Sequence, residues 1–155
     1  MDARYNKEAL IERIEAISSL RRKISLTNLD AVSFIESHST DWKQKTLVYL
    51  DPPYFETGRD LYYDFYKTND HANVATAVHR LTHVKWIVSY DDVLPIADLY
   101  EFDQGMRYQI KYSARNRIVG REAMFFSSEL KVPAVRGSMI EIERWEPKIS
   151  EVPLV

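Results

Sequence analysis

The sequence predicts an α/β fold, with a mostly parallel sheet that ends in a C-terminal antiparallel hairpin. Residues 45–50 and 85–90 are short apolar runs, typical of strands in a parallel sheet that is covered on both faces. Segments of helical periodicity alternate with these runs along the chain. Residues 106–113 and 122–128 instead alternate polar and apolar side chains, as the two strands of a hairpin do. Strand–helix alternation followed by a hairpin is typical of the α/β class.

The composition is that of one globular domain. The chain has 155 residues, of which 45% are apolar and 28% charged, enough to bury a core. Cysteine is absent, which excludes disulfides and thiolate metal sites, and we expect no metal. We also expect a soluble, cytoplasmic protein, because no apolar run is long enough to cross a membrane and the first residues do not resemble a signal peptide. The net charge of −2 gives no overall attraction to nucleic acid.

Periodicity and capping residues predict the other elements. Asn6 is a suitable N-cap for the first helix, in which apolar residues recur at helical spacing, and Asp70 is a suitable cap for a later one. The expected elements are a helix at 6–23, a short strand at 23–30, helices at 31–38, 70–81 and 93–100, and a final strand at 138–145.

Three acidic residues lie at or near the carboxyl ends of predicted strands. They are Asp30, Asp51 and Asp91. In open α/β sheets, ligands bind in the crevice outside the carboxyl ends of the strands. The placement of these three carboxylates therefore predicts a site at that edge of the sheet.

The sequence Asp51-Pro52-Pro53-Tyr54 directly follows the apolar run that ends at Leu50. The two prolines fix the backbone φ angle and have no N–H groups, so the turn is stiff and its carbonyls are not tied into a ladder. The Asp51 side chain and the carbonyls of Asp51 and Pro52 are acceptors that suit an amino group, and Tyr54 offers a flat face for a ring. The alternative is a strand-terminating turn with an ordinary aspartate cap.

This motif and its flanks resemble the site-specific DNA adenine methylases of the Dam-like type. The four letters alone also occur in enzymes that methylate guanine in ribosomal RNA, which stays an alternative. The flanking segments narrow the choice, because their order along residues 5–133 is that of the DNA enzymes: "NKEALIERIEAI", "ISLTNLDAVSFI", "YLDPPYFETGRDLYYDFYKTNDHANVA", "WIVSYDDVLPIADLY" and "YSARNRIVGREAMFFSSEL". The resemblance implies a partial Rossmann-like methyltransferase sheet.

The resemblance implies S-adenosylmethionine as the cofactor and duplex DNA as the partner. Asp51 and the Pro52 carbonyl would bind the exocyclic amine of an adenine flipped out of the duplex, while Tyr54 would stack on that base. Catalysis would then rest on positioning and electrostatics. The implied catalytic residues are Asp51, Pro52, Pro53 and Tyr54, and the implied cofactor-binding residues are Asp30, Ala31, Phe34 and Asp51. From its residues alone, Asp30 is also compatible with a helix cap.

Basic residues cluster in the predicted hairpin. Arg115, Arg117 and Arg121 are candidates for contact with DNA phosphates, and Arg107 and Lys111 lie nearby in the sequence. A solvated charged hairpin is the alternative. His71, in a segment that resembles a loop beside the target base, reads by itself as a surface histidine at the start of a helix.

The sequence also departs from the family. Its glycines, Gly58, Gly105, Gly120 and Gly137, form no G-x-G motif, whereas the family holds the methionine part of the cofactor with F-x-G-x-G. The family's target-recognition insert has no counterpart either. We therefore expect residues 1–133 to be the catalytic half of a methyltransferase domain, and residues 134–155 to be a C-terminal extension.

Two functions follow from this departure. The chain is expected to be a DNA adenine N6-methyltransferase catalytic half, completed by an N-terminal half or a second chain that pairs with its sheet. The alternative is an inactive remnant or a split-enzyme subunit that binds protein or DNA, because an unpaired sheet edge invites a partner.

Overall fold

The computed structural model describes residues 6–56, 66–110 and 120–148. The chain divides into two compact units, Met1–Asp30 and Ala31–Val155. Each unit has its own secondary structure. Within the described residues, no helix has both the length and the apolar character needed to cross a membrane.

The first unit contains one α-helix, α1 (Lys7–Ser19), followed by a 3₁₀ turn, η1 (Arg21–Lys23). The Asn6 side chain caps α1, because its Oδ1 accepts a hydrogen bond from the Ala9 N–H at 3.1 Å, as predicted. The strand expected at 23–30 is wrong. Residues 24–30 belong to no strand, since a strand exists only through hydrogen bonds to a neighbouring strand and this unit contains none among its described residues.

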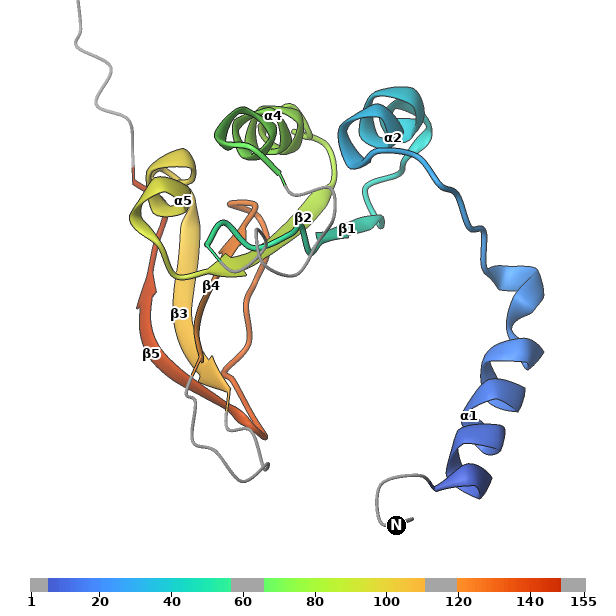
Figure 1. Cartoon of the computed structure of the whole chain (residues 1–155). Coiled ribbons are helices and arrows are strands. Elements are labelled where there is room, and N and C mark those ends of the chain that lie inside the picture. The colour runs from blue at the N-terminus through green and yellow to red at the C-terminus, as the bar shows by residue number, and fades with distance from the viewer. Residues whose placement is uncertain (1–5, 57–65, 111–119, 149–155) are drawn as a thin grey trace, which may run out of the picture. The chain divides into compact units, whose positions relative to one another are not determined.

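The second unit is a five-stranded sheet with helices (Figure 1). Its strands are arranged in the order β1-β2-β4-β3-β5. The elements in chain order are α2 (Ala31–His38), η2 (Ser39–Asp41), β1 (Leu47–Leu50), α4 (Thr68–His79), β2 (Lys85–Asp91), α5 (Leu94–Leu99), β3 (Gln104–Ile110), β4 (Gly120–Phe126) and β5 (Met139–Trp145).

The α/β class is confirmed, but the expectation of a mostly parallel sheet is wrong. Only β1 and β2 pair in parallel, while the pairs β2–β4, β3–β4 and β3–β5 are antiparallel. The sheet is mostly antiparallel because the hairpin formed by β3 and β4 pairs directly with β2. Its second strand, β4, lies between β2 and β3, and β5 adds a further antiparallel strand beyond β3. The final strand predicted at 138–145 is therefore part of this sheet.

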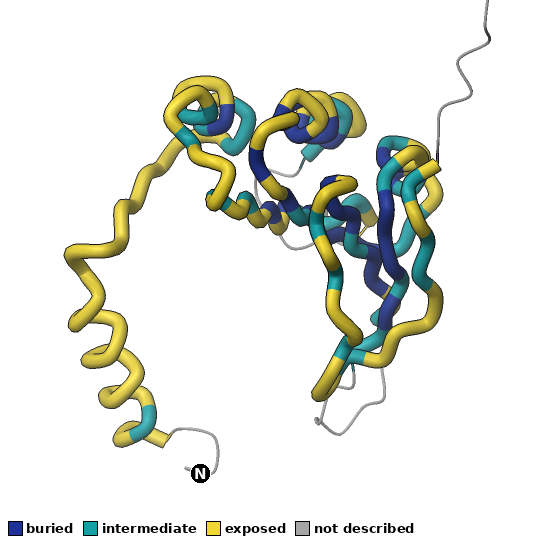
Figure 2. The backbone as a smooth tube through the Cα atoms, turned by 180° about the vertical axis from the view of Figure 1, so that it is seen from behind, coloured by how far each residue is buried: buried dark blue, intermediate teal, exposed yellow. Residues whose placement is uncertain are grey.

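Burial is concentrated on the central strands (Figure 2). On one face, Val88 and Tyr90 of β2 pack with residues of α4 and α5 such as Val78 and Ile96. On the other face, a smaller cluster around Met106 and Phe126 packs against the segment 130–139. Both faces of the central strands are thus covered.

The edge strand β1 is less buried than its apolar sequence predicts. Leu50 is buried, but Leu47 and Tyr49 are 54% and 56% exposed. Successive side chains of a strand point to opposite faces, so Leu47 and Tyr49 share one face, and this face is exposed. Among the described strands, β1 pairs with β2 on one side only. The expectation that this strand is covered on both faces is therefore wrong.

His71 is a core residue and not a surface one. It is 1% exposed, its Nδ1 lies 3.1 Å from the Tyr90 hydroxyl, and its ring contacts those of Phe55 and Tyr66. Burial lowers the pKa of His71, although the carboxylates of Asp91 and Asp70 oppose this shift. The sequence did not reveal this role because two of the aromatic partners, Phe55 and Tyr90, are distant along the chain.

Trp145 fixes the last strand to the sheet. Its indole N–H donates to the Asp103 carbonyl at 3.0 Å, and the Arg107 guanidinium lies over its ring at 5.0 Å from the centroid. The ring crosses β3 at Gly105, where a Cβ atom would lie 2.3 Å from Trp145 Cζ2. Gly105 is therefore required for the close approach of this side chain.

We expect Gly105→Ala to destabilise the protein by about 1–3 kcal/mol, as overpacking a filled site does. The added Cβ would also lie 2.9 Å from the Met124 carbonyl oxygen, which belongs to the backbone and cannot turn away. Thermal or urea unfolding measures the effect. Gly120→Ala is the matched control, because a Cβ there meets no described residue within 4 Å. Equal stability of the two variants would contradict the packing of Trp145 at Gly105.

We also expect the free energy of unfolding to fall as pH drops below 6.5, by at most about 1.4 kcal/mol per pH unit from His71. The pKa of His71 is lowered in the folded state, so its contribution is fully present above pH 6.5. Below that pH the unfolded chain takes up a proton that the folded state does not. His71→Gln should reduce the slope of stability against pH between 7 and 5 relative to the wild type. An equal slope in the two proteins would refute this assignment.

Candidate active site

The Asp-Pro-Pro-Tyr corner lies at the carboxyl end of β1, as the sequence predicts. Leu50 is the last residue of the strand, and the Asp51 residue that follows it is exposed. Pro52 is buried, while Pro53 and Tyr54 are half-buried. Because neither proline has an N–H group, the chain cannot continue the ladder with β2 and leaves the sheet here. The corner therefore presents a carboxylate on a stiff backbone.

Asp51 is oriented by a hydrogen-bond chain along the sheet. The Ser89 hydroxyl on β2 donates to Asp51 Oδ1 at 2.9 Å, and the Tyr49 hydroxyl lies 3.0 Å from the same Ser89 oxygen. A serine hydroxyl has a single hydrogen, so Tyr49 must be the donor in the second bond. Among the described residues, only Ser89 donates to Asp51, which leaves Oδ2 as an acceptor.

Asp91 holds the other end of the corner. It is the last residue of β2 and is 9% exposed. Its two carboxylate oxygens accept the backbone N–H groups of Phe55 at 2.8 Å and Glu56 at 2.9 Å. The prediction that Asp91 lies near the corner is therefore correct, but its carboxylate is occupied by the backbone.

Tyrosine side chains surround the corner on one face of the sheet. The Tyr108 hydroxyl on β3 donates to Glu122 Oε2 on β4 at 2.6 Å. Burial and this hydrogen bond raise the pKa of Tyr108, and the nearby phenols of Tyr54 and Tyr49 add to the rise. Tyr108 is thus a neutral donor, and Tyr49, Tyr54 and Tyr108 place phenol groups near one another.

The basic residues at the base of the hairpin are paired with acids. The Asp92 carboxylate forms ion pairs with the Arg107 Nε at 2.7 Å and with the Arg121 guanidinium at 3.1 Å. Arg107 also forms an ion pair with Glu143. These bonds raise the pKa of Arg107. The Arg121 side chain is 57% exposed. Arg115 and Arg117, and also Lys111, lie outside the described residues, so phosphate contact by the hairpin stays a prediction.

The residues expected to bind the cofactor are distributed over both units. Asp30 is the last residue of the first unit and is exposed. Ala31 and Phe34 belong to α2, where the half-buried Phe34 ring stacks on His38 at 4.5 Å and lies 6.1 Å from the Trp42 ring. The site described above therefore contains Asp51 to Tyr54, while the roles of Asp30, Ala31 and Phe34 stay predictions.

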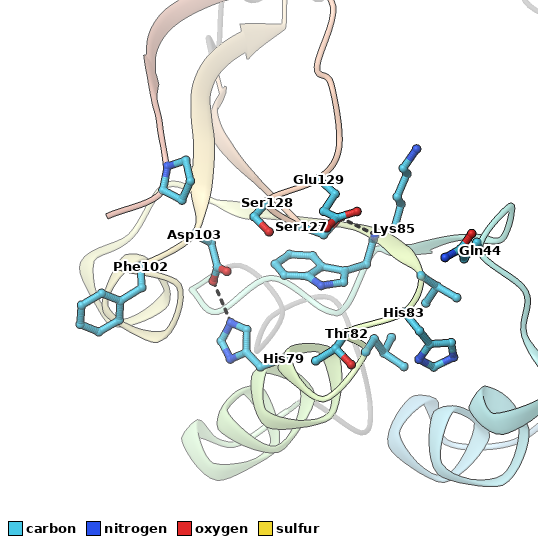
Figure 3. A pocket seen from close by; sticks show the side chains of 14 residues that line it. Gln44, His79, Thr82, His83, Lys85, Phe102, Asp103, Ser127, Ser128 and Glu129 are labelled. Carbon is cyan, nitrogen blue, oxygen red and sulfur yellow. Dashed lines mark hydrogen bonds and ion pairs between the residues drawn. The ribbon is translucent and has the colours of Figure 1, made fainter. Parts of the chain in front are cut away.

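A separate cavity of about 510 Å³ lies at the opposite end of β2 (Figure 3). It is lined by residues that include Lys85 and Trp86 at the start of β2, and its His79 Nε2 pairs with Asp103 Oδ2 at 2.7 Å. Ser89 and Asp91 lie at the other end of the same strand. The Asp-Pro-Pro-Tyr corner, with its carboxylate on a stiff Pro-Pro backbone, is therefore not part of this cavity.

Sequence reasoning missed Ser89, Tyr108 and Glu122. Serine and tyrosine are common in strands and carried no signal by themselves. Alternation was the available signal: Ser89 and Asp91 are two residues apart on β2, so they lie on the same face of the sheet. The pairing of β2 with β4, which places Glu122 opposite Asp91, could not be read from the sequence.

The comparisons with known proteins identify a family for this chain. Residues 2–117 match the model of a family described as D12 class N6 adenine-specific DNA methyltransferase. A search of curated proteins found no match to this chain. The matched span covers more than half of the sequence and includes the Asp-Pro-Pro-Tyr corner, which confirms the resemblance to DNA adenine methylases. The chain therefore belongs to the D12 class N6 adenine-specific DNA methyltransferase family.

Proposed function

We propose that this chain carries the catalytic corner for methyl transfer from S-adenosylmethionine to the N6 amine of an adenine that is flipped out of duplex DNA. The family supports the general reaction. The methyl donor, the extruded base and the residue roles are our proposal. Phosphate contact by Arg115, Arg117 and Arg121 belongs to the same proposal.

The orientation of Asp51 is the observation that carries the proposal. One of its oxygens accepts the Ser89 hydroxyl, so the other oxygen is an acceptor of fixed direction on an exposed side chain. Within the described part of the chain, the Pro52 carbonyl takes no hydrogen bond from another residue. An aromatic amine has two hydrogens, which match these two acceptors. Such an arrangement recognises the amine of a flipped adenine by its hydrogen-bonding edge.

In this proposal Asp51 and the Pro52 carbonyl bind and orient the amine, and Tyr54 stacks on the base. Two accepted hydrogen bonds leave electron density on the amine nitrogen and hold its lone pair in one direction. A preorganised carboxylate contributes most where positive charge develops, as it does on a nitrogen that gains a methyl group. Pro53 keeps the backbone of the corner stiff, so the two acceptors need little rearrangement to bind the amine in the reactive orientation.

S-adenosylmethionine would supply an electrophilic methyl group on its sulfonium. Asp30 is an exposed carboxylate suited to the amino group of the cofactor's adenine, with Ala31 and Phe34 beside it in the sequence. The three glycines in the described ranges do not complete the site. Gly105 is packed under Trp145 within β3, Gly120 begins β4, and Gly137 adopts φ +81° outside any helix or strand. In this proposal the described residues supply contacts for the adenosine end of the cofactor, and none of them is assigned to its methionine end.

The free side of β1 supports a second proposal, that the chain works together with another polypeptide. β1 is an edge of the sheet, and Leu47 and Tyr49 on it are more than half exposed. Unpaired backbone groups on an edge strand pair readily with a strand from elsewhere. An N-terminal half or second chain that adds such a strand is our proposal, and an inactive binding module is its alternative.

We expect Asp51→Ala to lower the rate of adenine methylation by roughly two to three orders of magnitude, the cost of removing one preorganised electrostatic group. Transfer of a labelled methyl group to duplex DNA measures the rate, with the chain alone and with any partner that restores activity. Asp41→Ala, which removes another aspartate of the same unit, is the control. Undiminished activity of the Asp51 variant would mean that the corner is only a structural turn.

We expect the isolated chain to bind S-adenosylmethionine weakly, without saturation in the micromolar range. The described glycines provide no turn for the methionine end, so only the interaction of Asp30 with the adenine end remains. Isothermal titration calorimetry is the measurement. Micromolar binding that Asp30→Ala abolishes, and that Asp41→Ala leaves intact, would instead reveal a different pocket for the methionine end.

A further inference from the structure

We propose that Ser89 and Asp91 are positioning residues for the methylation corner, and that together they form a clamp on residues 51–56. We call this pair the β2 clamp. Both side chains come from the carboxyl end of β2, and each contacts a different end of the corner. Their place in methyl transfer rests on the proposed function, whereas the clamp itself does not.

The geometry of the strand explains why these two residues act together. Residues two apart on a strand project from the same face, so the Ser89 hydroxyl and the Asp91 carboxylate both face the corner. Ser89 is 3% exposed and Asp91 is 9% exposed. Polar groups at this depth are costly unless they are hydrogen-bonded, and the corner supplies the partners of both. The two buried polar side chains at the carboxyl end of β2 therefore have their hydrogen-bond partners in the corner.

Ser89 acts on the side chain of Asp51. The bond from its hydroxyl fixes Oδ1, and the Tyr49 hydroxyl in turn fixes the direction in which Ser89 donates. Without this chain, the exposed Asp51 carboxylate is free to rotate about χ1. A misplacement of about 1 Å can lower the rate of a positioned reaction about 100-fold. Ser89 thus sets the direction of the carboxylate without touching the substrate.

Asp91 acts on the backbone of the corner. Pro52 and Pro53 provide no N–H groups, so the first amides that can anchor the corner after Asp51 are further along the chain. Asp91 binds two of these, at Phe55 and Glu56, through separate oxygens. The Phe55 ring also lies 5.2 Å from the buried His71 ring, which contacts Tyr90 between the two clamp residues. Three successive residues of β2 therefore support the corner.

The first test of the clamp does not require enzyme activity. Amide hydrogen exchange of Phe55 and Glu56 in the full chain should accelerate at least about 10-fold in Asp91→Asn, because an amide side chain cannot accept both N–H groups. Three-bond couplings should report a single χ1 rotamer for Asp51 in the wild type and averaging in Ser89→Ala. Ser127→Ala is the matched control, since its hydroxyl accepts the Trp86 N–H at the other end of β2. Unchanged exchange and couplings in both clamp variants would overturn the proposal.

The second test asks whether Ser89 acts through Asp51. Ser89→Ala should lower kcat for methylation by about 10- to 100-fold with little change in KM for DNA, and Ser89→Thr, which keeps the hydroxyl, should restore most of the rate. Adding Ser89→Ala to Asp51→Ala should cause no further loss, because the group it positions is gone. Additive losses, or no rescue by threonine, would overturn this role. A wild-type chain that stays inactive both alone and with a completing partner would count against the proposed function, while hydrogen exchange would still decide the clamp.

Discussion

The Asp91 carboxylate binds the loop that follows β1, and the candidate site depends on this interaction. A chain that leaves a strand through two prolines loses its ladder partners, so its path must be fixed from elsewhere. Asp91 fixes it by accepting two backbone N–H groups, at Phe55 and Glu56. A buried carboxylate needs such bonds itself, since an unpaired one would be strongly destabilising. The loop and the carboxylate therefore stabilise each other.

The antiparallel arrangement of the sheet decides what surrounds this interaction. Because β4 lies next to β2, Glu122 is opposite Asp91, and Tyr108 of β3 is opposite Glu122. The Tyr108 hydroxyl donates to Glu122, which satisfies one buried carboxylate beside another. In a mostly parallel sheet a different strand would have been the neighbour of β2. The face that carries Asp51 is thus built from β2 and from both strands of the hairpin.

Charge pairing restrains the base of the same hairpin. Asp92 binds both Arg107 and Arg121, so part of the positive charge is already neutralised by the protein. Arg107 is further held between Glu143 and the face of Trp145, which connects the last strand to this network. Exposed ion pairs of this kind are weak and sensitive to salt, whereas Asp92, whose side chain is 11% exposed, is better shielded. Of the two arginines that pair with Asp92, Arg121 has the more exposed side chain, at 57% against 25% for Arg107.

The sequence by itself determined the elements whose signals are local. The capped helix at Lys7–Ser19, the helix at Ala31–His38, the apolar runs around β1 and β2, and the hairpin strands all follow from periodicity and end signals. The Asp-Pro-Pro-Tyr corner belongs to the same group, because its stiffness comes from the covalent structure of proline.

Only the tertiary structure decided which strands are neighbours and which groups meet. The apolar run at β1 carries no sign that one of its faces is exposed. Residues 24–30 look like a strand, although the described residues of their unit contain no partner strand. Ser89, Tyr90 and His71 read as ordinary strand and surface residues until β2 is placed beside β1 and under α4. The physical reason is that hydrogen bonds between strands and contacts across a core join residues about 20 to 40 positions apart. The local pattern of a sequence records which face of an element is apolar, but not what packs against it.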